Sequence, residues 1–363
     1  MAKYKIAWLP GDGVGAEVLE AARIVLDTLP FDAEYMHGDI GWEFWKSEGD
    51  ALPQRTMELL KSADAAMFGA ITSKPAKAAA DELAPALRDK GLTYRSPIVR
   101  MRQLFDLYVC FRPCKAYPGN PLNFKEGIDL VIFRENTEDL YSGVEFAEFP
   151  DHLRTLPEFA KVPQGAAVSL KINTRKGCER IIRAAFDFAR KEGRKKVTCV
   201  HKANVVRASD GLFLSTFKDA AAEYKDISSD EANIDALCMW LLKNPFNYDV
   251  LVAPNLYGDI ISDLCAQMVG GLGFASSGNI GEKVAVFEPT HGSAPKYAGM
   301  YKVNPLATIL AARLMLDWLG CKEDAARIDD AVAKVIAKGE CRTYDMGGSA
   351  KTLEMANAVA AEL

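Results

Sequence analysis

Short apolar runs alternate along the chain with longer segments in which apolar residues recur every three or four positions. Short apolar runs are typical of buried strands, and the three-to-four spacing is typical of amphipathic helices. The runs that we interpret as strands are residues 5–9, 65–70, 129–134, 197–201 and 250–254. The segments that we interpret as helices are residues 15–29, 174–192, 210–224, 305–319 and 323–338. This alternation predicts an α/β protein with much of its sheet parallel.

One long segment breaks the alternation. Residues 142–164 are interrupted by proline and show no periodicity, and they precede a strand-like run at residues 166–172. Long irregular segments are uncommon in compact proteins, and when they protrude they commonly contact another subunit. We therefore expect an arm that takes part in a subunit contact.

Length and charge restrict the class of protein. A chain of 363 residues with 49% hydrophobic and 26% charged residues has room for about two globular domains. The net charge of −5 argues against nucleic-acid binding, and no apolar run approaches the roughly 20 residues of a membrane helix. The N-terminus enters a predicted strand without an apolar signal segment, and the eight cysteines form no C-x-x-C pair. We expect a cytoplasmic protein with reduced thiols and neither nucleic-acid nor membrane partners.

A glycine motif follows the first predicted strand. Residues 11–16 read GDGVGA, which formally satisfies the dinucleotide fingerprint G-x-G-x-x-G/A. The acidic residue expected about 20 positions later has candidates in Asp32 and Glu34, which lie in a poor strand context. We interpret the motif as a tight turn that requires glycine, because a second glycine-rich segment is the better candidate for a cofactor.

Two aspartates follow the predicted strand at residues 250–254. Asp259 and Asp263 are four apart, so on a helix both carboxylates lie on one face, one turn apart. Hard oxygen ligands suit Mg²⁺ or Mn²⁺ better than zinc, and a position just beyond a strand end is where open α/β sheets bind ligands. The alternative is a solvated acidic face of a helix.

Three arginines lie near the ends of predicted elements. Arg102 and Arg112 flank residues 104–111, and Arg134 ends a predicted strand. A guanidinium group matches a carboxylate with two hydrogen bonds, so the three arginines could converge on a di- or tricarboxylate. The alternative for each arginine is ordinary surface charge.

Two further residues could move protons. Lys202 directly follows the predicted strand at residues 197–201, and nearby positive charge would lower its pKa and make it a general base. The alternative is a solvated loop lysine. Tyr141 lies seven residues beyond Arg134.

A second glycine-rich segment spans residues 270–281, and residues 287–299 follow it with the sequence FEPTHGSAPKYAG. His291 lies in this Gly/Pro-rich loop, and a loop of this composition can bring its backbone close to a nucleotide.

Together these blocks resemble the isocitrate, 3-isopropylmalate and homoisocitrate family of metal-dependent β-decarboxylating dehydrogenases. The resemblance runs from Gly11 to about Gly348. It implies a two-domain α/β subunit with a mixed sheet that is not a Rossmann fold, so the turn at Gly11 is structural. The implied ranges are 1–107 with 270–363 for the large cofactor domain, 108–138 with 175–269 for the small dimerisation and substrate domain, and 139–174 for a clasp or arm.

The resemblance also implies roles for individual residues. Asp259, Asp263 and Asp235 match metal ligands for Mg²⁺ or Mn²⁺, and Asp235 would come from the partner subunit. Lys202 of the partner subunit matches the base, and Tyr141 matches the acid. The enzyme would then be a homodimer with shared active sites. The residues implied to bind substrate are Ser96, Arg102, Arg112, Arg134 and Asn204. The residues implied to bind the cofactor are Thr72, His291, Gly292, Lys296, Tyr297, Val303, Asn304 and Tyr344.

The choice among family members depends on few positions. Ser96 matches the serine with which isocitrate enzymes hold the γ-carboxylate, although Ser96-Pro97 also fits an ordinary helix start. Ile98 departs from the isocitrate pattern towards isopropylmalate enzymes, and Thr72-Ser73 resembles homoisocitrate enzymes. We favour oxidative decarboxylation of isocitrate, with homoisocitrate and 3-isopropylmalate as alternatives. A non-catalytic regulatory subunit is a further alternative, and it would be expected to have lost metal or base positions.

The cofactor expectation is NADP⁺, with NAD⁺ still usable. Lys296-Tyr297, Val303 and Tyr344 match NADP-dependent isocitrate enzymes, whereas NAD-dependent relatives usually carry an aspartate that repels a 2′-phosphate. Gly348 stands where the NADP enzymes have an arginine, so the resemblance implies incomplete discrimination.

Overall fold

The computed structural model describes residues 3–363, so the first two residues of the predicted large domain lie outside the described residues. Ten strands form one sheet in the order β2-β1-β3-β12-β11-β4-β5-β10-β8-β9. Strand β4 is antiparallel to both of its neighbours, β11 and β12 are antiparallel, and the remaining pairs are parallel. The predicted α/β class with a mixed sheet is confirmed. The strands are β1 (Tyr4–Gly11), β2 (Ala33–His37), β3 (Ala65–Ala70), β4 (Val109–Lys115), β5 (Asp129–Glu135), β8 (Lys196–His201), β9 (Ser228–Asn233), β10 (Val250–Ala253), β11 (Ser276–Ile280) and β12 (Ala285–Pro289).

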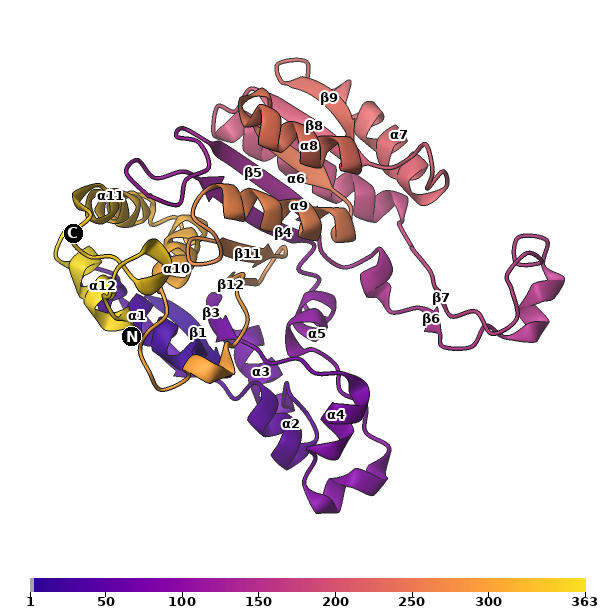
Figure 1. Ribbon diagram of the computed structural model, residues 1–363, viewed down its shortest axis with the longest axis horizontal. Coiled ribbons are helices and arrows are strands. Elements are labelled where there is room, and N and C mark those ends of the chain that lie inside the picture. The colour runs from indigo at the N-terminus through magenta and orange to yellow at the C-terminus, as the bar shows by residue number, and fades with distance from the viewer. Residues whose placement is uncertain (1–2) are drawn as a thin grey trace.

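Two lobes share this sheet, and β11 and β4 lie near the middle, where the lobes join (Figure 1). One lobe contains both chain ends and α10–α12, and the other contains α6–α9 (Figure 1). The helices are α1 (Gly15–Leu26), α2 (Trp42–Glu48), α3 (Gln54–Ser62), α4 (Ala76–Asp81), α5 (Pro97–Leu104), α6 (Arg175–Lys191), α7 (Ser209–Ala221), α8 (Ile234–Lys243), α9 (Asn255–Met268), α10 (Leu306–Trp318), α11 (Lys322–Lys338) and α12 (Thr352–Ala360).

Strand β5 separates two apolar cores. Val131 and Phe133 pack into a core with α6 and α7, whereas Leu130 and Ile132 pack into a core with α8 and α9. This division follows from the alternation of side chains along a strand. Consecutive residues of β5 therefore belong to opposite faces of the sheet.

The predicted arm protrudes from the α6–α9 lobe (Figure 1). Its only regular strands are β6 (Glu145–Phe146) and β7 (Val168–Ser169), which pair antiparallel with each other. The strand predicted at residues 166–172 is therefore too long. Strand β6 has only two residues, so it pairs with only Val168 and Ser169 of that run. Phe149 packs against Phe146 and Phe159 at centroid separations of 5.7 and 5.1 Å, which gives the arm a small aromatic core.

Two further predictions need correction. Helix α1 ends at Leu26 rather than Leu29, and Pro30 explains the early end because it has no N–H to donate to the Leu26 carbonyl four residues earlier and its ring would clash with that carbonyl. Glu34 lies on β2, which pairs in parallel with β1, so the strand context that we considered poor does form a strand. The turn itself packs tightly: a Cβ at Gly11 would lie 1.9 Å from the Ala70 carbonyl oxygen. Glycine is therefore required there for packing, as predicted.

Candidate active site

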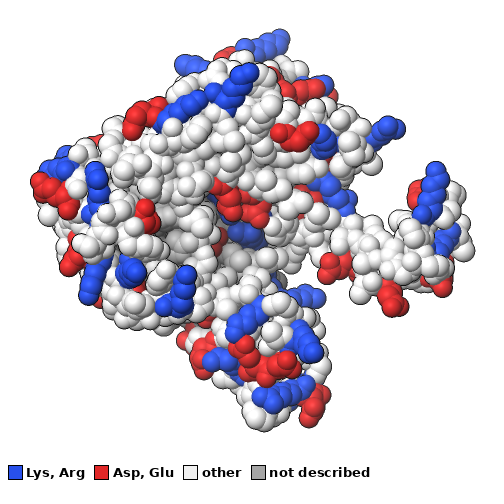
Figure 2. All heavy atoms as spheres, in the orientation of Figure 1, with Lys and Arg blue, Asp and Glu red and all other residues white. Residues whose placement is uncertain are grey.

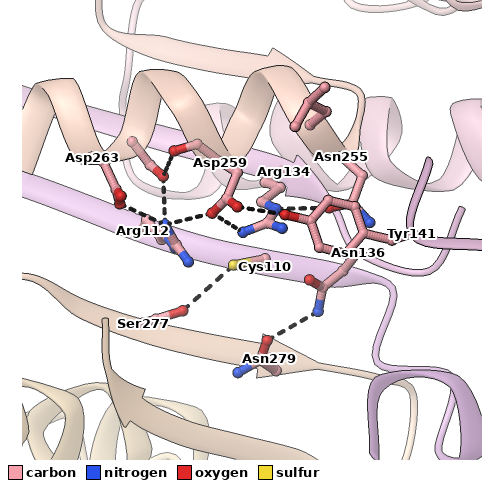
Figure 3. Close-up of polar contacts among 12 residues, drawn as sticks. Cys110, Arg112, Arg134, Asn136, Tyr141, Asn255, Asp259, Asp263, Ser277 and Asn279 are labelled. Atoms are coloured by element: carbon pink, nitrogen blue, oxygen red, sulfur yellow. Dashed lines mark hydrogen bonds and ion pairs between the residues drawn. The ribbon is translucent and has the colours of Figure 1, made fainter. Parts of the chain in front are cut away.

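Helix α9 brings the two predicted metal ligands over β4 and β5. The helix begins at Asn255, directly after β10, and Asp259 and Asp263 lie on consecutive turns of it. A Cβ at Gly258 would lie 2.6 Å from the Arg134 side chain, so glycine permits the close approach of α9 to β5. Arg112 of β4 and Arg134 of β5 reach towards the same stretch of α9 (Figure 3).

The two aspartates share one guanidinium group. Arg112 Nη1 lies 3.3 Å from Asp259 Oδ1 and 3.2 Å from Asp263 Oδ1. Arg134 forms an ion pair with Asp259, and its side chain is 1% exposed. The hydroxyl of Tyr141 donates a 2.6 Å hydrogen bond to Asp259 Oδ2 (Figure 3). The structure thus brings together five predicted groups: two carboxylates, two arginines and a tyrosine.

The charges of this cluster are not fully paired. Burial raises the pKa of Asp259, but Arg134 and Arg112 outweigh burial and hold that pKa below its usual value. Burial and the charge of Asp259 raise the pKa of Asp263.

Arg112 Nε and Arg134 Nη2 are buried and lack a hydrogen-bond partner within the protein. Buried donors of this kind are normally satisfied, so the two arginines are suited to receive a carboxylate ligand.

Arg102 has different neighbours. Its Nε donates a 2.9 Å hydrogen bond to Asn279 Oδ1, and its Nη2 lies 3.3 Å from Glu288 Oε1. Asn136 donates to the same Asn279 oxygen over 3.0 Å. Sequence reasoning missed Asn136, Asn279 and Glu288 as individual site residues, although each lies inside or beside a motif that it had singled out.

Ser96 and Asn204 form no hydrogen bond or ion pair with this cluster. Helix α5 begins at Pro97 as predicted, but the Ser96 side chain forms no capping hydrogen bond and is half-buried. Asn204 is exposed in the loop after β8.

Lys202 and Asp235 contact each other instead of the Asp259 pair. Lys202 follows β8, and its ammonium group forms an ion pair with Asp235 in the first turn of α8. Lys202 lowers the pKa of Asp235 through this contact. Within residues 3–363, no three His, Cys, Asp or Glu side chains lie close enough together to hold a metal ion. One chain therefore gathers two of the three predicted metal aspartates.

Two interactions fix the turn that carries Lys202. Asp210 accepts the backbone N–H of Lys202 at 2.7 Å, and His201 Nδ1 accepts the backbone N–H of Ala203 at 3.0 Å. Burial lowers the pKa of His201. The sequence predicted His201 only as the last residue of the strand at residues 197–201.

A cavity of about 580 Å³ lies beside the second glycine-rich segment. Six predicted cofactor residues line it: His291, Gly292, Tyr297, Val303, Asn304 and Tyr344. Residues 270–273 form another wall, in which three glycines accompany Leu272 and leave backbone exposed to the cavity. Sequence reasoning missed the remaining lining residues, which are Val14, Leu122, Gln267, Ala294 and Asp345.

The remaining predicted cofactor residues lie close to this cavity. Thr72 shares a 2.6 Å hydrogen bond with Ser293, the residue after Gly292. Lys296 lies 4.8 Å from the centre of the Tyr297 ring. Lys302, which sequence reasoning missed, lies 5.4 Å from the Tyr297 ring and 5.0 Å from the Tyr344 ring. Two cations thus flank a pair of tyrosines at one end of the cavity.

Gly348 is confined by the backbone. A Cβ at this position would lie 2.1 Å from the carbonyl oxygen of Arg342. An arginine, which the resemblance places here in NADP enzymes, would require the segment from Arg342 to Gly348 to move.

The comparisons with known proteins agree with this geometry. The family model described as isocitrate/isopropylmalate dehydrogenase matches residues 5–359. The chain is 42% identical over 359 residues to a 3-isopropylmalate dehydrogenase of Archaeoglobus fulgidus, with 99% of each chain covered. It is 40% identical over 358 residues to an isocitrate/homoisocitrate dehydrogenase of Thermus thermophilus, with 98% of this chain and 97% of the relative covered. The solved structure of isocitrate dehydrogenase from Methylococcus capsulatus superimposes with a TM-score of 0.88 at 37% identity and covers 99% of each chain. The chain therefore belongs to the isocitrate/isopropylmalate dehydrogenase family and is a decarboxylating hydroxy-acid dehydrogenase.

Proposed function

We propose that the protein catalyses the oxidative decarboxylation of isocitrate to 2-oxoglutarate, with hydride transfer to NADP⁺ and with Mg²⁺ or Mn²⁺. The observation that carries this proposal is the cluster in which Arg112 and Arg134, each with an unpartnered buried donor, face Asp259, Asp263 and Tyr141. Cationic donors would bind the substrate carboxylates, and the adjacent acids and phenol supply metal-binding and proton-donating groups.

The donor set fits a hard divalent cation. Asp259 and Asp263 each direct one oxygen towards the same nitrogen of Arg112, so the two carboxylates lie on one side of α9 and close enough to share a cation. A divalent cation held by these carboxylates would polarise the 2-hydroxyl group of the substrate and stabilise the negative charge that decarboxylation leaves on the oxygen. Asp235 of the partner subunit would add a third carboxylate.

Two groups would move protons. Lys202 of the partner subunit would take the proton of the 2-hydroxyl group, which allows hydride to leave C2 for the nicotinamide. Tyr141 would then protonate the carbon that loses CO₂. Burial, together with the Asp259 carboxylate that accepts its hydrogen bond, raises the pKa of Tyr141, so the hydroxyl retains its proton near neutral pH and can donate it.

A homodimer would complete the site. Lys202 and Asp235 lie away from Asp259 within one chain, and a second copy could supply both. Helix α8, the turn that follows it and helix α9 expose large apolar side chains. Such side chains are typical of an interface between subunits. These are Met239, Trp240, Leu242, Phe246 and Ile260. On this basis we propose that residues 108–138 and 175–269 form the dimerisation domain, that 1–107 and 270–363 form the cofactor domain, and that 139–174 form the arm.

The substrate assignment depends on the start of α5. The Ser96 hydroxyl has no capping role and is free to bind a third carboxylate, which favours isocitrate or homoisocitrate. Val99 precedes Arg102 by three residues and shares its face of the helix, which favours a substrate with an apolar substituent, such as 3-isopropylmalate. Two similar proteins are named 3-isopropylmalate dehydrogenase, so we propose 3-isopropylmalate as the second candidate substrate.

A substrate matrix tests these proposals. The purified protein would be assayed with isocitrate, homoisocitrate and 3-isopropylmalate, each with NAD⁺ and NADP⁺, with and without Mn²⁺. We expect the highest kcat/KM for isocitrate with NADP⁺ and no turnover without metal. A higher kcat/KM for 3-isopropylmalate would establish the second candidate. Absence of turnover with all three substrates would support the regulatory-subunit alternative.

A further inference from the structure

A second cavity, of about 350 Å³, lies on the reverse side of the strands that carry the substrate arginines. Phe111, Pro113 and Lys115 of β4 line this cavity, whereas Arg112 between them faces the active site. On β5, Asp129 and Val131 line the cavity. Side chains alternate along a strand, so the cavity and the active site lie on opposite faces of β4 and β5.

The cavity also joins the two lobes. Its walls include Phe188 and Glu192 from the end of α6 in one lobe, and Leu310, Arg313 and Asp317 from α10 in the other. Phe274 and Ser276 line it as well, and Phe274 directly follows the glycine segment of the nucleotide cavity. A molecule in this cavity would therefore contact both lobes and the backs of the elements that form the substrate and nucleotide sites.

The lining combines an apolar floor with three cations and four carboxylates, and one of the cations is poorly paired. Two of the three cations have carboxylate partners. Lys115 Nζ lies 2.5 Å from Asp329 Oδ2, and Arg194 Nη2 lies 2.7 Å from Asp129 Oδ1. Arg313 lies 3.9 Å from Asp317, beyond hydrogen-bonding distance, and its buried Nε has no hydrogen-bond partner. The apolar side chains of the lining are Phe111, Val131, Phe188, Phe274, Leu310 and Leu314.

We propose that this cavity is a regulatory site for a small monocarboxylate with an apolar body, whose carboxylate pairs with Arg313. A carboxylate would supply the hydrogen-bond acceptor that Arg313 Nε lacks, and an aromatic or branched group would cover the apolar floor. The volume is at the lower end of the range for small-molecule sites, which suits a ligand of about ten non-hydrogen atoms.

The position of the cavity also sets the direction of the regulation. If the lobes rotate about the central strands to narrow the active-site face, α6 and α10 separate on the reverse face. A ligand that contacts both helices in the arrangement described here loses contacts when they separate, so it favours this arrangement. Because coupling between two ligands is reciprocal, the carboxylate would weaken substrate binding, and substrate would weaken carboxylate binding.

Binding of 4-fluorophenylacetate, followed by ¹⁹F NMR, tests the site without any need for activity. The uncharged 4-fluorophenylacetamide is the control for the carboxylate. We expect the acid to bind at least about tenfold more tightly than the amide, Arg313→Gln to remove that preference, and Arg313→Lys to retain part of it. Arg327→Gln, on the exposed surface of α11, should leave binding unchanged.

A control must exclude binding of the acid to the active-site arginines. Binding that persists in Arg313→Gln but disappears in Arg134→Gln would place the ligand in the active site and overturn the proposal, as would absence of binding to the wild-type protein. Kinetics provide the second test.

We expect a saturating concentration of 4-fluorophenylacetate to raise the KM for isocitrate, the proposed substrate, at least about threefold in the wild-type enzyme and not in Arg313→Gln. An unchanged KM with proven binding would overturn the regulatory role.

Discussion

The hydroxyl of Tyr141 donates its hydrogen to Asp259 Oδ2, while Arg134 pairs with the other oxygen of the same carboxylate. The predicted proton donor and a predicted metal ligand are therefore in direct contact. The face of the Tyr141 ring also lies 5.0 Å from the Arg134 guanidinium group. The phenol is thus held between a predicted metal ligand and an arginine predicted to bind substrate, a position that suits the proposed late proton donor.

Replacing Tyr141 with phenylalanine removes only the hydroxyl group. We expect turnover to fall about 10²-fold to 10⁴-fold, the range of general acid catalysis, while the first burst of reduced cofactor retains most of its rate. Rapid-mixing absorbance at 340 nm, compared with steady-state turnover, separates the two steps. Equal slowing of burst and turnover would show that Tyr141 acts before or during hydride transfer.

Replacing Asp259 with asparagine tests the metal site. A neutral amide is a poor ligand for a hard cation, so we expect most turnover to be lost and the concentration of Mn²⁺ needed for half-maximal rate to rise. Thermal unfolding with and without Mn²⁺ provides a readout that does not depend on turnover: the wild-type protein should be stabilised by the ion, and the variant much less. Asp219→Asn, at an exposed surface ion pair, is the matched control. Full wild-type turnover in the presence of a chelator would contradict the assignment.

The sequence was sufficient for much of the sheet because hydrophobic pattern and buried strands coincide in an α/β fold. Residues 65–70 form β3 with the predicted bounds, and the helix predicted near residues 174–192 is α6, Arg175–Lys191. The failures have local causes. Strand β2 lies at the sheet edge, and all five of its residues are half-buried or exposed. Its sequence therefore shows no clear apolar run that would predict a strand.

The site could be predicted where a motif places its residues on one element, as with Asp259 and Asp263 on α9. Contacts between distant elements could not be predicted. Arg102 and Asn279 are 177 positions apart, and their hydrogen bond depends on how α5 meets β11. Lys302 lacks a motif of its own, and its proximity to the Tyr344 ring depends on how the loop between β12 and α10 packs against the loop between α11 and α12.

Mixing two inactive variants tests the shared site. Lys202→Met should lack the base, and Asp259→Asn should lack a metal ligand, so each homodimer should be inactive. After subunit exchange, a mixed dimer would contain one site with both groups intact, and we expect up to about one quarter of wild-type activity from an equal mixture. Native mass spectrometry would verify the exchange. No recovery in a mixture with proven exchange would argue against sites shared between subunits.

Stability should fall in mild acid because of His201. The folded protein holds its imidazole neutral, since burial lowers the pKa of His201 below 6.5 and Nδ1 accepts the Ala203 N–H. The unfolded chain binds more protons below about pH 6.5, so the free energy of unfolding decreases as pH falls through this range, with a limiting slope of about 1.4 kcal/mol per pH unit for one proton.

His201→Asn should flatten this part of the stability profile. The side-chain oxygen of asparagine can accept the Ala203 N–H but does not titrate. Urea unfolding between pH 5 and pH 7.5 measures the difference, and His152→Asn in the exposed arm serves as the control. An identical slope in the wild-type protein and His201→Asn would show that other groups cause the acid sensitivity.

Cofactor preference should depend on both lysines beside the tyrosine pair. A 2′-phosphate carries nearly two negative charges near neutral pH, so charge-assisted hydrogen bonds from Lys296 and from the hydroxyls of Tyr297 and Tyr344 can favour NADP⁺ by about 1.5–3 kcal/mol, or roughly 10-fold to 150-fold in kcat/KM. Lys302 lies in the same loop, 5.4 Å from the Tyr297 ring and 5.0 Å from the Tyr344 ring, and adds a second positive charge. The preference should stay at the modest end of that range because Gly348 leaves the site without the arginine, and the Arg342 backbone leaves no room to restore it.

Three variants separate these contributions. Lys296→Asp should reverse the preference, because repulsion replaces attraction at the same position. Lys302→Ala should lower kcat/KM for NADP⁺ by about threefold to tenfold and leave that for NAD⁺ nearly unchanged, since only the 2′-phosphate distinguishes the two cofactors. Lys283→Ala, in the turn between β11 and β12, controls for the loss of a surface charge. Isothermal titration of each variant with 2′-phospho-AMP and AMP would show whether the effect arises in binding. A wild-type preference for NAD⁺, or a ratio that Lys296→Asp leaves unchanged, would mean that the 2′-phosphate is not bound at this tyrosine pair.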